Sequence, residues 1–150
     1  MNQKNIKHEI CINNIKKDNY NLEFLNTRIY GNENDSSSVI YTELNGYKFM
    51  FMGDAGVERE KDILDKYNLS DIDVLKVGHH GSNTSSSENF IKNISPKYSL
   101  ISVGENNRYG HPKDSVLNIL RNSKIYRTDQ DGSIMFKIRN NKLKIKTCNP

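Results

Sequence analysis

Three short apolar runs, each ending in a glycine and a polar loop, constrain the fold of this chain more than any other feature. The runs and the glycines that follow them are Tyr47–Met52 with Gly53, Asp73–Val77 with Gly78, and Tyr98–Val103 with Gly104. Their length and their β-branched and aromatic residues are typical of buried strands. Helical patterns follow each run, at residues 57–68, 85–94 and 112–122. This alternation predicts an α/β or α+β layered domain.

The remaining segments carry further strand patterns. Leu22–Tyr30 and Ser38–Leu44 read as strands, and Asn45-Gly46 is a strong signal for a hairpin turn into Tyr47–Met52. The nearly unbroken apolar run of Tyr47–Met52 indicates burial on both faces. Three more short strands are expected near the end of the chain: Lys124–Arg127, Ser133–Arg139 and Leu143–Thr147. The sequence therefore predicts a mixed sheet with flanking helices.

The helix at 57–68 is expected to turn its apolar residues toward the core. Those residues are Val57, Ile63, Leu64 and Tyr67. Pro112 suits the first turn of the helix that follows it, and the serines near residue 85 can cap the helix at 85–94. Residues 1–20 are polar and weakly patterned.

The charge of the chain is uneven. Net charge is +4, but residues 121–150 carry eight Lys or Arg against two Asp, a local charge of +6. Such an end can face nucleic acid or another polyanion, or it can be a solvated lysine-rich surface. Hydrophobic residues make up 35%, which is low for a self-contained domain and fits one that lacks part of its core.

Two cysteines, Cys11 and Cys148, lie near opposite ends of the chain and outside any Cys-x-x-Cys pair. Reduced thiols are the default, and a disulfide between the two would require an oxidising compartment. No apolar run reaches the roughly 18–20 residues that span a bilayer, and no signal-peptide core is present. A free chain of this sequence is expected to be cytoplasmic.

The polar groups after the three runs are candidate functional residues. Ligand sites in open α/β sheets form beyond the carboxyl ends of the strands, so neighbouring strands would bring these loops to one rim. The first loop carries Asp54 and the second carries His79 and His80. The third carries Asn106, Asn107, Tyr109 and His111. Their expected convergence is a stronger argument than any single residue.

Each of these residues also has a plain structural reading. Asp54 can ligate a metal or cap the following helix. Adjacent residues of an extended chain point in opposite directions, so His79 and His80 are expected to do different jobs. Either could be a metal ligand, with His79 preferred because it comes directly off the strand.

The other candidates are substrate contacts. Ser82 can donate to an anionic substrate or sit in a turn. His111 can be a proton donor, a phosphate contact or the residue that starts a helix. Asn107 and Tyr109 can bind substrate or belong to ordinary loop chemistry. His8 has no supporting context and is treated as surface, and no Gly-x-Ser-x-Gly elbow presents a nucleophilic serine.

Taken together, these motifs resemble the metallo-β-lactamase fold, and within it the hydrolase domain of the ComEC family of DNA-uptake competence proteins. The matching segments are Ser37–Ile40, Phe49–Ala55, Asp73–Ser82, Ser102–Gly104, Asn107, Tyr109–Pro112, Tyr126–Asp129 and Gly132. The likeness runs from about Asn26 to Thr147, and residues 1–25 match poorly.

This resemblance implies an αβ/βα sandwich with two zinc or manganese ions at the strand ends. Asp54 falls at the family's metal-bridging aspartate and the His79-His80 pair at its late metal-binding histidine. His111 falls in a loop near the site. The competence-protein domain is thought to act as a nuclease on incoming DNA, and relatives hydrolyse phosphodiesters and other esters.

The departure from the family lies upstream of Asp54, where the early His-x-His/Asp-x-Asp-His motif and the next histidine ligand are absent. The chain 1–150 is therefore expected to be a single, incomplete domain, a partial sandwich that leaves apolar surface exposed. One hypothesis is a hydrolase half that needs a complementary N-terminal half-domain, with Asp54 and His79 on the metal and His80, Ser82 and His111 on the phosphate. The alternative is a non-catalytic remnant or nucleic-acid-binding module. Within a full competence protein the chain would be membrane-associated or extracytoplasmic.

Overall fold

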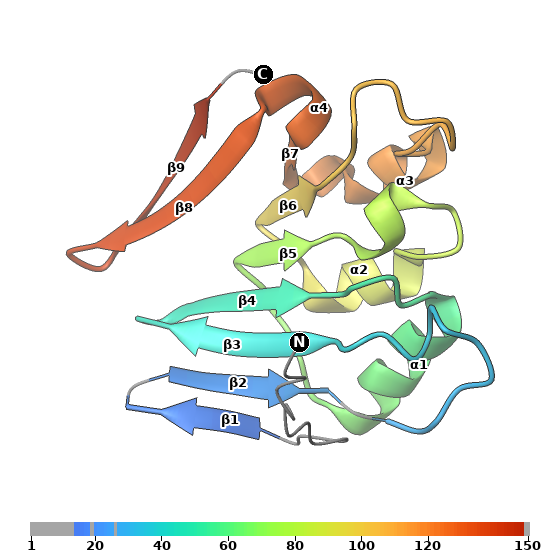
Figure 1. Ribbon diagram of the computed structural model, residues 1–150. Coiled ribbons are helices and arrows are strands. Elements are labelled where there is room, and N and C mark those ends of the chain that lie inside the picture. Colours follow the sequence, from blue (N-terminus) through green and yellow to red (C-terminus); the bar gives the residue numbers. More distant parts are fainter. Residues whose placement is uncertain (1–13, 19, 26, 149–150) are drawn as a thin grey trace, which may run out of the picture.

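The computed structural model describes residues 14–18, 20–25 and 27–148 (Figure 1). A sheet of seven strands runs in chain order from β1 to β7, and β8 and β9 form a separate hairpin. Three helices, α1 (Val57–Lys66), α2 (Glu88–Ile94) and α3 (Asp114–Ile119), follow β4, β5 and β6. The expected mixed sheet with flanking helices is confirmed.

The first half of the sheet is antiparallel. It consists of β1 (Asn14–Lys17), β2 (Tyr20–Phe24), β3 (Ile40–Leu44) and β4 (Tyr47–Phe51). Asn45 and Gly46 turn between β3 and β4 with φ of 49° and 78°, so the hairpin prediction is confirmed. The short strand β1 lies at the sheet edge, within the polar segment for which the sequence gives no clear strand pattern.

Strand β2 ends at Phe24, and the prediction of a strand as far as Tyr30 is wrong. The chain turns away because α1 binds the segment that follows. Arg59 donates to the carbonyl of Leu25 at 2.9 Å, and the Tyr30 hydroxyl donates to Asp62 at 2.6 Å. These bonds draw the segment after β2 over α1 and out of the ladder.

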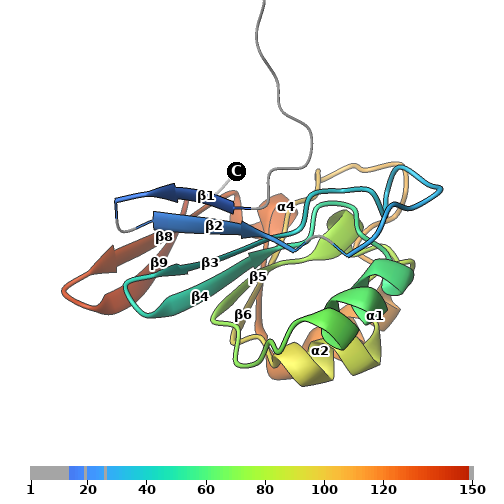
Figure 2. The same ribbon diagram turned by 90° about the horizontal axis from the view of Figure 1, so that it is seen from below.

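The second half of the sheet is parallel, with β5 (Val74–Lys76), β6 (Tyr98–Ile101) and β7 (Lys124–Arg127) continuing from β4. Helices α1 and α2 lie on the same face of the sheet (Figure 2). The core between the layers consists of fully buried apolar side chains such as Met50, Met52, Ile63, Leu75, Val77, Phe90, Ile94, Ile101 and Leu120. Parallel order places the carboxyl ends of β4, β5 and β6 at one edge.

The inward face of α1 differs from the prediction. Ile63 is buried and Leu64 and Tyr67 pack against the core as expected, but Val57 is exposed, and Arg59 and Glu60 are buried. Both charged groups have hydrogen-bond partners: Glu60 accepts from the backbone N–H of Ser87 at 2.8 Å, and Arg59 donates to Leu25. A charged side chain can be buried where such partners replace water. Burial raises the pKa of Glu60, and the N–H donors oppose that rise.

The later helices begin close to the expected positions. Ser87 caps α2, and its hydroxyl accepts from the backbone N–H of Phe90, which confirms a serine cap. Helix α3 begins at Asp114, two residues after Pro112, and is continued by the 3₁₀ turn η2 (Leu120–Asn122). None of the helices in the described part of the chain is long and apolar enough to cross a membrane.

After β7, the short helix α4 (Thr128–Asp131) leads into β8 (Ser133–Arg139) and β9 (Lys142–Cys148). The hairpin runs back along the sheet toward the turn between β3 and β4 (Figure 1), where the Tyr47 hydroxyl accepts from the backbone N–H of Leu143 at 3.0 Å. The Phe136 ring centroid lies 6.4 Å from that of Phe49 and 6.5 Å from that of Tyr126. Apolar residues of β8 therefore pack against the sheet face opposite the helices.

This second face is only partly covered. Phe51 is 42% exposed, so the expectation that the whole Tyr47–Met52 run is buried is wrong. A groove of about 380 Å³ lies between the sheet and the hairpin, lined mainly by Leu44, Phe49, Phe51, Val74, Lys76, Leu100, Phe136 and Ile138. Cys148 is exposed, and Cys11 and His8 lie outside the described residues, so the pairing of the two cysteines stays open.

Candidate metal-binding site

The loops after β4, β5 and β6 meet at one edge of the sheet, as the sequence predicts. Nε2 of His80 lies 4.0 Å from Oδ1 of Asp54. The His79 ring centroid lies 6.5 Å from that of His80 and 6.0 Å from that of His111. Four of the candidate residues are thus brought into one cluster by three separate strand ends.

The loop that carries the two histidines is not extended. Gly78–Gly81 forms the 3₁₀ turn η1, in which His79 and His80 have φ of 44° and 55°. The premise that His79 and His80 lie in extended chain is therefore wrong, and their ring centroids lie 6.5 Å apart. Left-handed φ is uncommon outside glycine, and such conformations gather at functional sites.

Tertiary contacts hold this turn. The backbone N–H of His79 donates to the carbonyl of Gly53 at 2.9 Å, which ties the second loop to the first. Gly81, with φ of 80°, packs so closely on Pro112 that a Cβ at residue 81 would lie 2.6 Å from the proline Cβ. That packing ties the second loop to the third.

His80 is oriented for binding a metal. Its Nδ1 lies 2.6 Å from the carbonyl oxygen of Ser102, and a carbonyl oxygen only accepts, so Nδ1 carries the proton. In the neutral ring Nε2 is then a bare acceptor that faces Asp54, another acceptor. A backbone carbonyl that fixes the tautomer is the usual support for a metal-binding histidine.

The two acceptors lie close enough to share one divalent ion after a small side-chain movement. Bonds of roughly 2.0–2.2 Å at a tetrahedral angle would set the two ligand atoms about 3.4 Å apart, so they would have to approach each other from the 4.0 Å seen here. Asp54 and His80 are each about half exposed, so the site is open to solvent. No group of three or more His, Cys, Asp or Glu that could hold a metal exists among the described residues. The described residues therefore fit one edge of a metal site.

His79 makes a different contact. Its Nδ1 lies 3.2 Å from Oγ1 of Thr84, which also bonds the Ser82 hydroxyl at 3.0 Å. Ser82 is buried and its oxygen accepts from the backbone N–H of Thr84. The nearby Ser85 hydroxyl bonds the carbonyl of Gly78 at 3.0 Å. These serines build the turn beneath the histidines.

His111 faces the cluster from the third loop. Its Nδ1 is buried and has no hydrogen-bond partner among the described residues. Burial lowers the pKa of His111, and the charge of Lys113 and the imidazoles of His79 and His80 lower it further. A neutral ring at pH 7 agrees with the unpartnered nitrogen, because an imidazolium would need a partner at both nitrogens.

Asn107 and Tyr109 frame His111. The Asn107 amide accepts from the backbone N–H of His111 and donates to its carbonyl, both at 2.8 Å, so it shapes the loop. The exposed Tyr109 ring stacks on His111 at 5.9 Å, and its hydroxyl accepts from Arg108 at 2.8 Å. Tyr109 and Arg108 together form a polar rim beside the histidines.

Several supporting residues were not foreseen from the sequence. Asp54 does not cap α1, because the N-cap is Gly56, whose N–H donates to buried Asp35 at 2.8 Å. The Ser37 hydroxyl accepts from the backbone N–H of Asp54 at 3.1 Å. The sequence offers one signal for these supporting residues, the spacing of Asn32 and Asp35 in a polar loop. Side chains of this kind often bond within such loops, and here the Asn32 amide donates to Asp35 at 2.8 Å.

Lys76 adds a cation next to the site. Its ammonium donates to the carbonyl of Val77 at 3.0 Å. Burial lowers the pKa of Lys76, while the carboxylate of Asp54 opposes that shift. Lys76 also lines the apolar groove, and so it links the groove to the candidate site.

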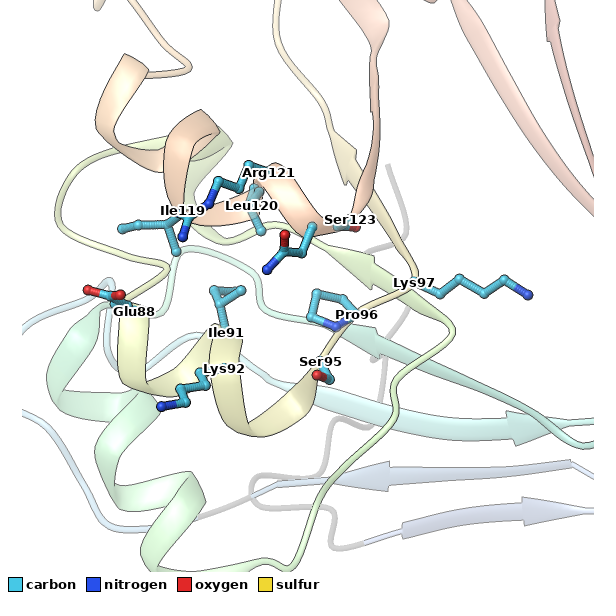
Figure 3. Close-up of a pocket in the computed structure, with 11 residues that line it drawn as sticks. Glu88, Ile91, Lys92, Ser95, Pro96, Lys97, Ile119, Leu120, Arg121 and Ser123 are labelled. Carbon is cyan, nitrogen blue, oxygen red and sulfur yellow. The ribbon is translucent and has the colours of Figure 1, made fainter.

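A further cavity, of about 470 Å³, lies on the helical side between α2 and η2 (Figure 3). Its charged residues are Glu88, Lys92, Lys97 and Arg121. None of the clustered histidines lines it, so it is separate from the candidate metal site.

A mixed sheet with helices on one face, and an aspartate and paired histidines at its strand ends, agrees with the metallo-β-lactamase fold that the sequence resembles. Residues 15–105, more than half of the chain, match the family model of the metallo-beta-lactamase superfamily, and the chain belongs to that superfamily.

Its relatives include competence proteins. It is 41% identical over 110 residues to ComE operon protein 3 of Bacillus subtilis (strain 168), covering 72% of this chain and 14% of that protein. It is 39% identical over 108 residues to competence protein ComA of Neisseria gonorrhoeae, covering 69% of this chain and 16% of that protein. Recombination protein 2 of Haemophilus influenzae is 32% identical over 115 residues, covering 75% of this chain and 14% of that protein. The resemblance to the ComEC family is confirmed, and the chain spans about one seventh of these relatives.

Proposed function

We propose that this chain is the carboxyl-terminal part of a metal-dependent hydrolase that cleaves phosphodiesters and serves DNA uptake. The observation that carries the proposal is the opposition of Asp54 and His80, two acceptors 4.0 Å apart at adjoining strand ends. The names of two relatives, a competence protein and a recombination protein, support DNA as the substrate.

Asp54 and one of the paired histidines hold a zinc or manganese ion in this proposal. The sequence favours His79, whereas the fixed tautomer of His80 and its distance to Asp54 favour His80. A divalent metal bound there would supply an activated water and polarise a phosphoryl oxygen. The other histidine then faces the substrate.

His111 and its neighbours handle the phosphate group. The lowered pKa of His111 keeps the ring neutral at pH 7, so the imidazole can take up a proton or accept a hydrogen bond. Tyr109 and Arg108 at the rim can bind a phosphate oxygen. Asn107 shapes the loop that carries His111. Buried Ser82 does not contact the phosphate but holds Thr84, which contacts His79.

The site needs a complementary amino-terminal half-domain. Hydrolytic zinc sites use about three protein ligands for each metal, and the described residues bring two into position. The apolar groove and half-exposed Phe51 offer a surface that such a partner would bury. We therefore expect the chain to be inactive alone. Within a full competence protein it would be membrane-associated or extracytoplasmic, and as a free chain cytoplasmic.

Metal titration tests the proposal. Isothermal titration of the purified chain with zinc and with manganese should give binding that Asp54→Asn abolishes. Asp65→Asn is the matched control, because Asp65 is exposed on α1 and pairs with Lys61 of the same helix. Absence of any Asp54-dependent binding would remove the main support for the catalytic role.

Nuclease activity is the second readout. Plasmid cleavage should require both the metal and an added polypeptide that carries the early His/Asp motif. Cleavage by the chain without that polypeptide would contradict the dependence on a partner, even if the metal binds as expected.

A further inference from the structure

The outer face of the β8–β9 hairpin carries a concentrated positive charge. Residues 133–148 contain five cations and no Asp or Glu. All five are exposed and alternate with the apolar residues that face the sheet. This basic face consists of Lys137, Arg139, Lys142, Lys144 and Lys146.

The pairing of the two strands sets like charges against each other. Lys137 lies directly opposite Lys144, and Arg139 lies directly opposite Lys142. Like charges at such positions destabilise a sheet. None of the five cations forms an ion pair with any residue that the structure describes. The hairpin thus keeps two repulsive pairs that no carboxylate of the described residues compensates.

The basic face is shaped as well as charged. A shallow groove of about 470 Å³ runs along it, lined by the five cations and Asn140. The remaining side chains of the face are Ser133, Met135 and Cys148. No aromatic ring lies on it, so stacking on unpaired bases is not available. The groove therefore offers only charge and hydrogen-bond donors.

We propose that the basic face binds the phosphate backbone of a double-stranded nucleic acid without sequence preference. Side chains on one face of a strand repeat about every 6.8 Å, which is roughly two phosphates along one strand of a duplex. A two-stranded ribbon is also an element that a major groove of about 12 Å admits. Contacts of lysine and arginine side chains with phosphates carry no sequence information.

An anionic membrane is a poorer match for this face. Segments that lie on membranes combine cations with large apolar side chains that enter the headgroup region. Here Met135, 58% exposed, is the one large apolar side chain on the outer face, and the others of the hairpin turn toward the sheet. The charge also continues along both strands, as a duplex requires.

The basic face is independent of the candidate metal site. The hairpin tip contacts Tyr47 at the start of β4, whereas Asp54 lies beyond the end of that strand. Binding by the basic face can therefore be measured in EDTA, where metal-dependent cleavage does not occur. Failure of this proposal and failure of the proposed hydrolase function are then separate results.

The test is fluorescence anisotropy of the full chain with labelled 20-base-pair duplexes of two unrelated sequences, in EDTA, between 50 and 200 mM salt. Five phosphate contacts predict a slope of log K against log salt near −4.5, or about a 500-fold loss over this range. Lys142→Gln with Lys144→Gln should reduce the slope to about −2.7 and the loss to about 40-fold. Both sequences should bind equally.

Two double variants control the experiment. Lys92→Gln with Arg121→Gln removes the same charge at the cavity on the helical side and should leave the slope unchanged (Figure 3). Lys142→Arg with Lys144→Arg keeps the charge and should bind as the parent chain does. The proposal is overturned if the helical-side variant loses as much affinity, if the arginine variant fails to bind, or if phosphatidylserine vesicles bind the hairpin and duplex does not.

Discussion

Nε2 of His80 faces Oδ1 of Asp54 across 4.0 Å, while Nδ1 of the same ring donates to the carbonyl of Ser102. In the proposed metal site this contact favours His80 as the ligand, whereas sequence position favours His79. His79 comes first off the strand, yet its Nδ1 contacts Thr84 and its ring lies toward His111. The backbone that holds His80 comes from the neighbouring strand, and no reading of the chain around residue 80 would reveal it.

We predict that His80→Ala weakens zinc binding far more than His79→Ala. Loss of a metal ligand should cost at least a hundredfold in affinity, because even residues that only orient a ligand cost about 10–100-fold. Isothermal titration of both variants, with circular dichroism to confirm folding, makes the comparison. A larger loss of zinc affinity in His79→Ala than in His80→Ala would show that His79 is the metal ligand.

We predict that His111 titrates below pH 6.5. Burial disfavours its charged form, so the unfolded chain takes up a proton near pH 6.5 while the folded chain resists. The stability that this group contributes is complete above pH 6.5 and is lost as the pH falls through the lowered folded pKa. NMR titration of the ring gives the midpoint directly. Lys113→Gln should raise it, because the charge of Lys113 helps to lower it.

Urea unfolding provides a second check on His111. The stability of the parent chain should fall more between pH 7 and pH 5.5 than that of His111→Gln, which has no proton to gain at this position. An equal fall in both proteins would show that His111 titrates normally.

The sequence predicts the framework of the site well, for a physical reason. Apolar runs that end in glycine mark where buried parallel strands must stop, and parallel strands share one edge. Asp54, His79 and His111 could therefore be placed together before any coordinates were known. The hairpin at Asn45-Gly46 and the serine cap of α2 are equally local and equally predictable.

The features that the sequence misses depend on contacts between distant segments. Arg59 and Glu60 read as the solvent side of a helix, but one binds the carbonyl of Leu25 and the other the amides before α2. The left-handed turn at His79 and His80 is set by the carbonyls of Gly53 and Ser102. Hydrophobic periodicity carries no information about such partners.

We predict that Gly81→Ala destabilises the fold by about 2–4 kcal/mol. Residue 81 has φ of 80°, and an added methyl would lie 2.6 Å from the Pro112 Cβ, so backbone strain and overpacking add together. Gly104→Ala is the matched control, because no atom lies within 4 Å of its added Cβ. It should change the free energy of unfolding by no more than about 0.5 kcal/mol in urea denaturation. Equal effects would mean that the contact of residue 81 with Pro112 is looser than described.

We predict that Phe51→Ser reduces self-association of the isolated chain. Phe51 is 42% exposed and lines the apolar groove. Two copies of the chain could therefore associate by packing their uncovered sheet faces together at this residue. Met135→Ser is the control, because Met135 is 58% exposed but lies on the outer face of the hairpin. Light scattering after size exclusion should show fewer oligomers for Phe51→Ser only. Identical profiles for both variants would count against the groove as an interface.

We predict that Lys144→Glu makes the hairpin more stable and nucleic-acid binding weaker. The substitution replaces a like-charge pair with an ion pair opposite Lys137, which should add about 0.5–1 kcal/mol to the free energy of unfolding. It also removes one phosphate contact and adds a repulsive charge, so duplex affinity should fall more than tenfold at 100 mM salt. Lys92→Glu makes the same charge change on α2, four residues after Glu88, and there it should slightly destabilise the helix and leave binding nearly intact. The expected result is that Lys144→Glu raises the free energy of unfolding and loses duplex binding, whereas Lys92→Glu lowers the free energy of unfolding and keeps binding. This result would show that the like-charge pairs favour binding and reduce stability. Weaker stability in Lys144→Glu, or equal loss of binding in both variants, would contradict that conclusion.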